Sequence, residues 1–238
     1  MKDILKIMRF DYLTAKPYAA LEMIFVIVMF GILAMLFSPI IAVYITFAAM
    51  VFVIPLQGVA DKNGFNKLYG ILPVKRSSIT MARFLYIFLV HFVTELIEAV
   101  LIIMAKSARL FRILPNQNSE MMEMVKDSFA DTPLTLYMLF GIFAFFCLMF
   151  TYMEMMGQIH GRENEFKILM ITVLVLTVLA FGYMTLSSHD ILPMMKFPDV
   201  PEKPGKIIAL GAVLNLVMLG LSLAFGFITT RKLAKREL

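Results

Sequence analysis

Long apolar runs alternate with short polar segments along most of the chain. Six of these runs hold about 20 residues, the number that an α-helix needs to cross the hydrocarbon core of a bilayer. Such a helix is stable there because its backbone amides and carbonyls bond one another. The pattern predicts an all-α polytopic membrane protein, with spans at residues 18–37, 40–57, 79–105, 134–153, 167–186 and 206–229.

The first 17 residues follow a different, amphipathic pattern. Apolar residues such as Ile4, Leu5, Met8 and Tyr12 recur at helical spacing, with charged residues between them. A helix of this kind lies along the membrane surface rather than across it. We therefore predict two parts, an interfacial amphipathic helix over residues 1–17 and a transmembrane domain over residues 18–238.

The longest polar segment, residues 106–133, shows order of its own. Asn118 and Ser119 are followed by Glu120 and Glu123, a pattern typical of a helix start. We expect a short surface helix whose apolar face is drawn from Met121, Met122, Val125 and Phe129. The other polar segments are predicted as loops at residues 58–78, 154–166 and 187–205.

Composition agrees with a membrane protein and argues against a soluble one. Hydrophobic residues make up 61% of the 238 residues, and charged residues only 16%. Ordinary soluble domains are nearer half apolar and a quarter charged. On so apolar a chain, the net charge of +5 indicates loops that face anionic lipid rather than a nucleic-acid partner. Cys147, the single cysteine, lies in an apolar run and is interpreted as a small buried hydrophobe.

The distribution of lysine and arginine predicts the orientation. The N-terminus, the segments after the second and fourth spans, and the C-terminal tail together hold 15 basic residues. The segments on the opposite side hold seven. Because cytoplasmic loops carry the excess of basic residues, both termini are expected in the cytoplasm, with the spans in a bacterial plasma membrane.

The third span carries three polar residues, His91, Glu95 and Glu98. Their spacing places them on one helix face. Charged groups at membrane depth are costly and normally face a protein interior or a water-filled cavity. They are our candidates for a translocation path or a proton or cation site, and a polar contact between helices is the simpler interpretation. No metal site is expected.

Several catalytic motifs are absent from the sequence. It contains no phosphate-binding loop of the G-x-x-x-x-G-K-[ST] type, no zinc-protease H-E-x-x-H and no G-x-S-x-G elbow. We therefore expect no enzyme and no cofactor on this chain. If ATP drives the protein, the ATPase must be a separate chain.

The polar segment at residues 58–78 suits contact with a soluble partner. The sequence of residues 61–69 predicts a short cytoplasmic helix parallel to the membrane, with Phe65, Leu68 and Tyr69 on one side. Leu72-Pro73-Val74 then turns the chain, and Lys75-Arg76 precede the next span. A short amphipathic helix can dock into a groove of a partner protein, although solvation of an inner loop explains it too.

This segment resembles a motif of the ABC-2 type permeases. That family has an acidic residue and a lysine, a short helix, Leu-Pro-Val and basic residues between its second and third spans. The match concentrates in residues 61–83, with Asp61 where the family often has Glu. The predicted surface helix, six spans and cytoplasmic termini resemble the same family, above all its small Gram-positive permeases that export peptides, including phenol-soluble modulins, or confer self-immunity.

The resemblance implies a transport subunit rather than an enzyme. Two permeases would pair, either as two copies of this chain or as this chain with a sister permease. Each would dock one ATPase subunit that binds ATP and Mg. The substrate would be an amphipathic or antimicrobial peptide. Coupling to the ATPase would fall on residues of the two inner loops: Asp61, Lys62, Phe65, Leu68, Tyr69, Leu72, Pro73, Arg162 and Glu163.

Other functions remain open at this stage. A secondary transporter would use Glu95 and Glu98 to bind protons or cations. Such carriers often contain inverted repeats and broken helices, and the sequence shows neither. An intramembrane enzyme is disfavoured by the missing motifs. An immunity protein that sequesters a toxic peptide without transporting it would share the same sequence features.

Overall fold

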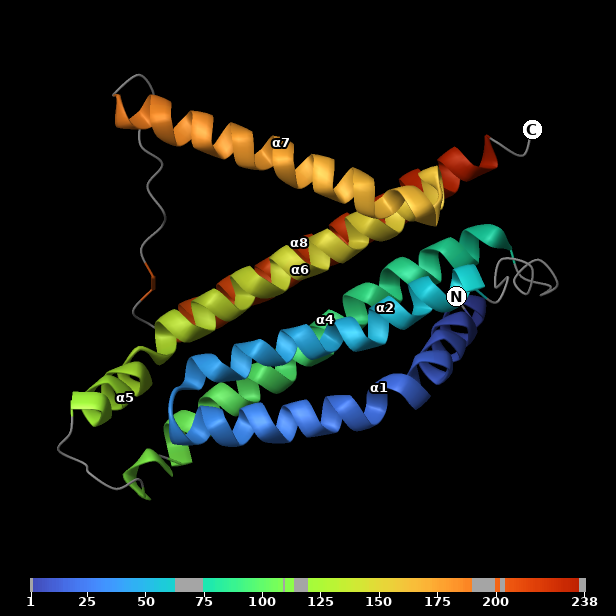
Figure 1. The fold of residues 1–238 in the computed structure, drawn as a ribbon. Coiled ribbons are helices and arrows are strands. Elements are labelled where there is room, and N and C mark those ends of the chain that lie inside the picture. Colours follow the sequence, from blue (N-terminus) through green and yellow to red (C-terminus); the bar gives the residue numbers. More distant parts are fainter. Residues whose placement is uncertain are drawn as a thin grey trace.

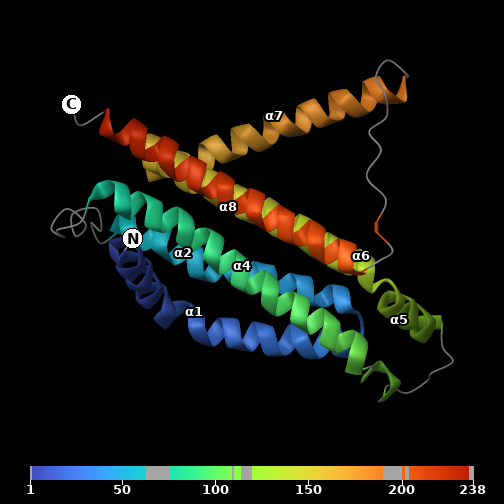
Figure 2. The same cartoon turned by 180° about the vertical axis from the view of Figure 1, so that it is seen from behind.

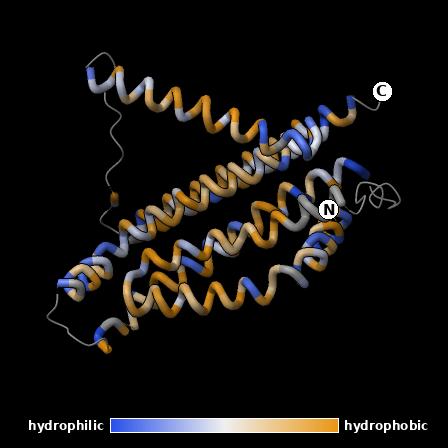
Figure 3. The backbone as a smooth tube through the Cα atoms, viewed as in Figure 1, coloured by the Kyte–Doolittle hydropathy of each residue, from blue (hydrophilic) through white to orange (hydrophobic). Residues whose placement is uncertain are grey.

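The computed structural model describes residues 2–62, 75–108, 110–113, 120–189, 200–201 and 204–235, and every element in these ranges is a helix (Figure 1). Five helical segments are long and apolar enough to cross a membrane: Ala19–Leu36, Arg76–Ala108, Thr132–His160, Phe166–Ser188 and Gly205–Ala234. The prediction of an all-α fold is confirmed. Apolar residues dominate the long helices, and hydrophilic residues gather towards their ends (Figure 3).

The N-terminal segment is not separated from the first span. Helix α1 runs without interruption from Lys2 to Leu36, with Pro17 inside it. Proline removes one backbone hydrogen bond and crowds the preceding turn, and this commonly bends a helix. Figure 1 shows α1 bent between its N-terminal part and the longer part that follows. The position of residues 1–17 at the membrane interface stays a prediction.

The second predicted span begins differently from the others. A 3₁₀ helix, η1, covers Pro39–Ile45, and α2 continues as an α-helix over Thr46–Lys62. The apolar helical stretch here, Pro39–Ile54, is shorter than the five long segments. Helix α2 nevertheless turns back along α1, and the two pack together (Figures 1 and 2). Five helical segments are long and apolar enough to span a membrane, and a sixth span stays a prediction.

Helix α4 (Arg76–Ala108) lies at the centre of the bundle. It contacts α1, η1, α2, α6 (Thr132–His160) and α8 (Pro204–Ala234). Helices α6 and α8 lie side by side in both views (Figures 1 and 2). One buried apolar cluster joins α1, η1, α4, α6 and α8 through residues that include Ala34, Val43, Ile102, Leu139 and Ile207.

The predicted loop at residues 154–166 is wrong. Helix α6 continues to His160, Gly161 alone makes the turn, and α7 (Arg162–Ser188) begins at the next residue. Polar residues end an apolar run without ending a helix, because the hydrogen bonds of a helix join backbone groups and do not depend on the polarity of the side chains. Helix α7 packs mainly against α6 and diverges from the bundle (Figure 1), and no residue from Phe166 to Leu186 is buried.

The polar segment at residues 106–133 contains the short helix that the sequence predicts. Helix α5 covers Glu120–Ala130, and a 3₁₀ turn, η2, covers Leu110–Ile113. Met122 and Phe129 of α5 are buried against Ala105 of α4. The apolar face predicted for this helix therefore holds it onto the bundle.

Candidate functional site

The three polar residues of α4 all face the interior of the bundle. His91, Glu95 and Glu98 expose only 2%, 2% and 0% of their surface. At a rise of 1.5 Å per residue, Glu98 lies roughly 15 Å along α4 from the helix end at Ala108. Two carboxyl groups are therefore buried well within a helix of spanning length.

Glu98 is held by the start of α2. The Thr46 hydroxyl donates a hydrogen bond to Glu98 Oε1 over 2.7 Å. Thr46 is itself buried, and it is the first residue of α2 after the 3₁₀ helix η1. Glu98 Oε2 is also buried, and it has no hydrogen-bond partner among the described residues.

Glu95 is held by the opposite side of the bundle. Asn215 Nδ2 of α8 donates to Glu95 Oε1 over 3.1 Å and also to the backbone oxygen of Gly211 over 3.0 Å. Glu95 Oε2 and Asn215 Oδ1 are buried without a partner in the described part of the chain. The two carboxyl groups thus tie α4 to two different helices, and each keeps one oxygen available.

His91 completes this polar cluster. Its Nδ1 lies 2.9 Å from the backbone oxygen of Ile87, and its ring centroid lies 5.4 Å from that of Phe150 on α6. A carbonyl oxygen can only accept, so Nδ1 carries the hydrogen of this bond. Nε2 is buried and meets no partner within the described ranges.

The cluster can hold a proton or interact with a polar group, and the described residues do not form a metal centre. Its available atoms are Glu95 Oε2, Glu98 Oε2, Asn215 Oδ1 and His91 Nε2. Buried acids without full hydrogen bonding are costly in a low-dielectric interior, which favours either a neutral carboxyl group or a bound partner. No three metal-binding side chains converge anywhere in the described ranges.

A buried ion pair joins α4 to α6 further along the bundle. Arg83 Nη1 lies 3.4 Å from Glu154 Oε1, and Gln158 also donates to that oxygen. Both charged residues are buried. Arg83 lies seven residues after the start of α4, and Glu154 lies six residues before the end of α6. The two residues are therefore at similar depths from the same end of the bundle. This similarity was a signal for the pair that the sequence interpretation did not use.

Two uncharged partners of the cluster were also missed. Asn215 is an amide within an otherwise apolar span, and such a group normally needs a partner inside the membrane. That rule would have selected Asn215 without naming Glu95. Thr46 offers no comparable signal, because threonine often bonds its own helix backbone.

The residues predicted to contact an ATPase fall partly inside and partly outside the described ranges. Asp61 and Lys62 form the end of α2, and Arg162 is the first residue of α7. Glu163 follows on α7 and is exposed. The remaining five, Phe65, Leu68, Tyr69, Leu72 and Pro73, lie outside the described residues.

Comparisons with known protein families, with curated proteins and with solved structures matched nothing. The fold alone therefore defines the class. It is an all-helical chain in which five apolar helices suit a membrane, with a buried polar cluster between α2, α4 and α8.

Proposed function

We propose that this chain is the membrane permease subunit of an ATP-driven ABC-2 type exporter of amphipathic peptides. Two copies would pair in a bacterial plasma membrane, and each would bind one separate ATPase chain. Both termini and the segment between α2 and α4 would face the cytoplasm, where that segment would contact the ATPase.

One observation carries this proposal. The segment that resembles the ABC-2 motif, residues 61–83, begins in the last turn of α2, which ends at Lys62, and runs into α4, which starts at Arg76. Those two helix ends lie at the end of the bundle that also holds both chain termini (Figures 1 and 2). The same end carries the excess of lysine and arginine that is typical of cytoplasmic segments.

The test is co-purification in detergent with candidate ABC ATPase chains from the same genome. The wild-type chain is expected to form a stable complex and to change the ATPase rate. Asp61→Ala and Leu68→Lys should weaken or abolish that complex. Glu123→Ala and Met124→Lys on α5 are matched controls, because both residues are exposed at the opposite end of the bundle.

The outcomes separate this proposal from other functions. Loss of the complex in the two loop variants, with binding intact in the two α5 controls, supports the ATPase contact. If no ATPase binds and the purified chain moves solute along a proton gradient, the ABC proposal is wrong. If it binds a toxic peptide without moving it, an immunity protein is the better description.

A second candidate function rests on the available carboxyl oxygens. Glu95 and Glu98 each have one buried oxygen without a described partner, and this favours a proton- or cation-coupled carrier. In proteoliposomes, that carrier would be driven by an imposed proton gradient and inactivated by Glu98→Gln. Transport that requires ATP and the ATPase chain, and that survives a proton ionophore, would exclude it.

A further inference from the structure

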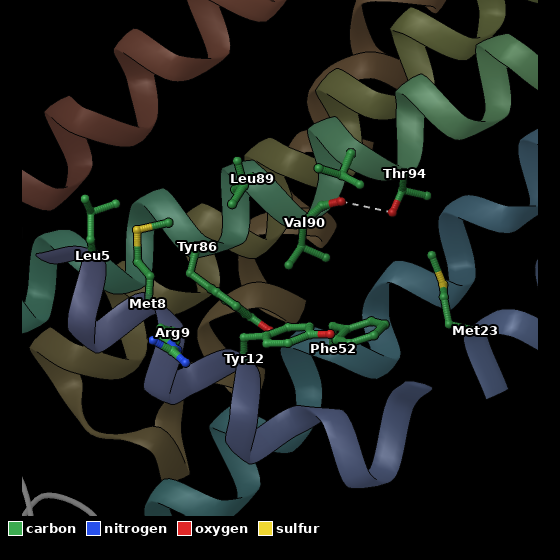
Figure 4. A pocket seen from close by; sticks show the side chains of 11 residues that line it. Leu5, Met8, Arg9, Tyr12, Met23, Phe52, Tyr86, Leu89, Val90 and Thr94 are labelled. Atoms are coloured by element: carbon green, nitrogen blue, oxygen red, sulfur yellow. Dashed lines mark hydrogen bonds between the residues drawn. The ribbon is translucent and has the colours of Figure 1, made fainter. Parts of the chain in front are cut away.

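A groove of about 400 Å³ lies between α1, α2 and α4 (Figure 4). The N-terminal part of α1 and Phe52 of α2 form one side, and α4 forms the other side through residues that include Tyr86, Leu89 and Val93. Tyr12 of α1 stacks on Phe52, with ring centroids 6.3 Å apart and nearly parallel planes. The groove has a volume within the range of small-molecule sites.

The groove opens on the outside of the helix bundle. Leu89 and Val93 of its α4 wall are 45% and 46% exposed, and Leu5 of its α1 wall is 61% exposed. In a membrane these side chains face lipid. A molecule in the surrounding bilayer can therefore reach the groove from the side.

The chemistry of the groove is apolar with one charged side chain. Among the described residues that line it, Arg9 alone is charged, and this arginine is exposed and forms no ion pair with any described residue. Tyr86 is 97% buried, and Figure 4 shows it pointing from α4 towards Tyr12 and Phe52. Its hydroxyl is enclosed by protein and does not open onto the groove.

We propose that this groove binds one acyl chain of an anionic phospholipid from the cytoplasmic leaflet. The chain would lie against the apolar walls, and the phosphate would meet Arg9 at the edge of the groove. The location fits, because Arg9 belongs to the basic N-terminal segment with Lys2, Lys6 and Lys16. Basic segments beside a span attract anionic lipid.

An acyl chain suits the groove better than a peptide does. An extended peptide brings backbone amides and carbonyls that need partners wherever water is excluded. Among the described lining residues, Arg9, Tyr12, Tyr86 and Thr94 carry polar side chains. The Tyr86 hydroxyl is enclosed by protein, and the Thr94 hydroxyl already donates to the backbone oxygen of Val90. A hydrocarbon chain needs no such partner. The site does not depend on the exporter function, but its assignment to the cytoplasmic leaflet rests on the cytoplasmic N-terminus proposed above.

Native mass spectrometry of the full-length protein tests this proposal. The protein is stripped of loosely bound lipid in detergent and then offered phosphatidylglycerol or phosphatidylcholine with identical acyl chains. The wild type is expected to retain one phosphatidylglycerol in preference to phosphatidylcholine. Because one basic residue contributes on the order of a fivefold change in affinity for anionic lipid, Arg9→Gln should reduce that preference about fivefold.

Further variants test the groove and its charge. Val93→Phe fills the groove and should remove the bound lipid, whereas Val213→Phe, on an exposed position of α8, should not. Tyr86→Phe removes only an oxygen that is closed off from the groove and should leave retention of both lipids unchanged. Arg231→Gln, an exposed arginine at the C-terminal end of α8, is the control for charge. Circular dichroism and gel filtration establish that each variant is folded.

Three results would overturn the proposal. The first is equal lipid retention by Val93→Phe and Val213→Phe, which would mean that the lipid binds elsewhere. The second is an unchanged lipid preference in Arg9→Gln, which would mean that no phosphate meets this arginine. The third is displacement of the lipid by an amphipathic peptide that Val93→Phe no longer binds, which would make the groove a peptide site.

Discussion

At the scale of single residues, the hydrogen bond between Thr46 and Glu98 has a measurable consequence. Thr46→Val keeps the shape of the side chain but removes the hydroxyl that donates to Glu98 Oε1. Because Glu98 Oε2 already has no described partner, the buried carboxyl group would lose its side-chain donor. Hydrogen bonds between membrane helices contribute about 0.5–2 kcal/mol. We expect Thr46→Val to lower the free energy of unfolding in detergent by about 1 kcal/mol.

Thermal unfolding of the purified protein measures this change. Thr185→Val is the matched control, because Thr185 is exposed on α7 and its hydroxyl bonds only the backbone of its own helix. Equal stability of Thr46→Val and the wild type would show that Glu98 finds another donor.

The sequence predicts the face of these residues better than their partners. The spacing of His91, Glu95 and Glu98 is enough to place them on one side of a helix, and all three are buried. Glu95 meets Asn215, which lies 120 residues away in the sequence. Contacts at such separation depend on how α4 and α8 pack, which helical spacing does not encode.

At the scale of helices, the ion pair between Arg83 and Glu154 connects α4 to α6. Removal of one partner leaves an uncompensated buried charge, which typically costs about 3–5 kcal/mol. Arg83→Met alone is therefore expected to destabilise the protein by about 3 kcal/mol. The double variant Arg83→Met with Glu154→Gln should be less destabilised than the sum of the two single variants.

A double-mutant cycle based on thermal unfolding gives this coupling energy. Gln158 also bonds Glu154, so Gln158→Ala is included to separate its contribution from that of the arginine. Additive effects of the Arg83 and Glu154 changes would show that the two side chains do not interact in solution. A single variant as stable as the wild type would contradict the assignment of a buried pair.

The turn between α6 and α7 depends on one glycine. Gly161 has φ +92° and ψ 143°, a backbone conformation that other residues rarely adopt. Gly161→Ala is therefore expected to cost about 1–3 kcal/mol of stability, measured by unfolding. Gly182→Ala, at an open position in α7, should leave stability unchanged or raise it slightly, because alanine favours a helix.

Helix boundaries show what hydropathy can and cannot predict. The apolar runs locate all five long helices, but the helices continue beyond them at several ends, as α6 does from Glu154 to His160. Hydropathy reports where hydrocarbon surrounds the chain, whereas a helix ends only where the backbone turns. Gly161 marks one such turn, and a glycine inside a polar segment was a signal for it.

At the scale of the whole molecule, the return of α2 along α1 decides the topology. If residues 39–62 cross the membrane, the chain crosses six times and both termini share one side. If they do not, Lys6 and Lys75 lie on opposite sides of the membrane. Lys235 shares a side with Lys75 in both cases, because the four helices α4, α6, α7 and α8 separate them. Whether Lys6 and Lys75 lie on the same side of the membrane therefore decides between six crossings and five.

Single cysteines at these positions test this topology in intact cells. Cys147→Ala provides a background without native thiols, and Lys6, Lys75, Lys235 and Glu123 are each replaced by Cys, since all four are exposed. We expect a membrane-impermeant maleimide to label only the Glu123→Cys protein, and the other three to react after lysis. Labelling of Lys6→Cys in intact cells, with Lys75→Cys protected, would establish five crossings and remove the topological support for a permease. Joint protection of Lys6 and Lys75 requires the α1–α2 hairpin to cross and return, and it places the segment between α2 and α4 where a cytoplasmic ATPase can reach it.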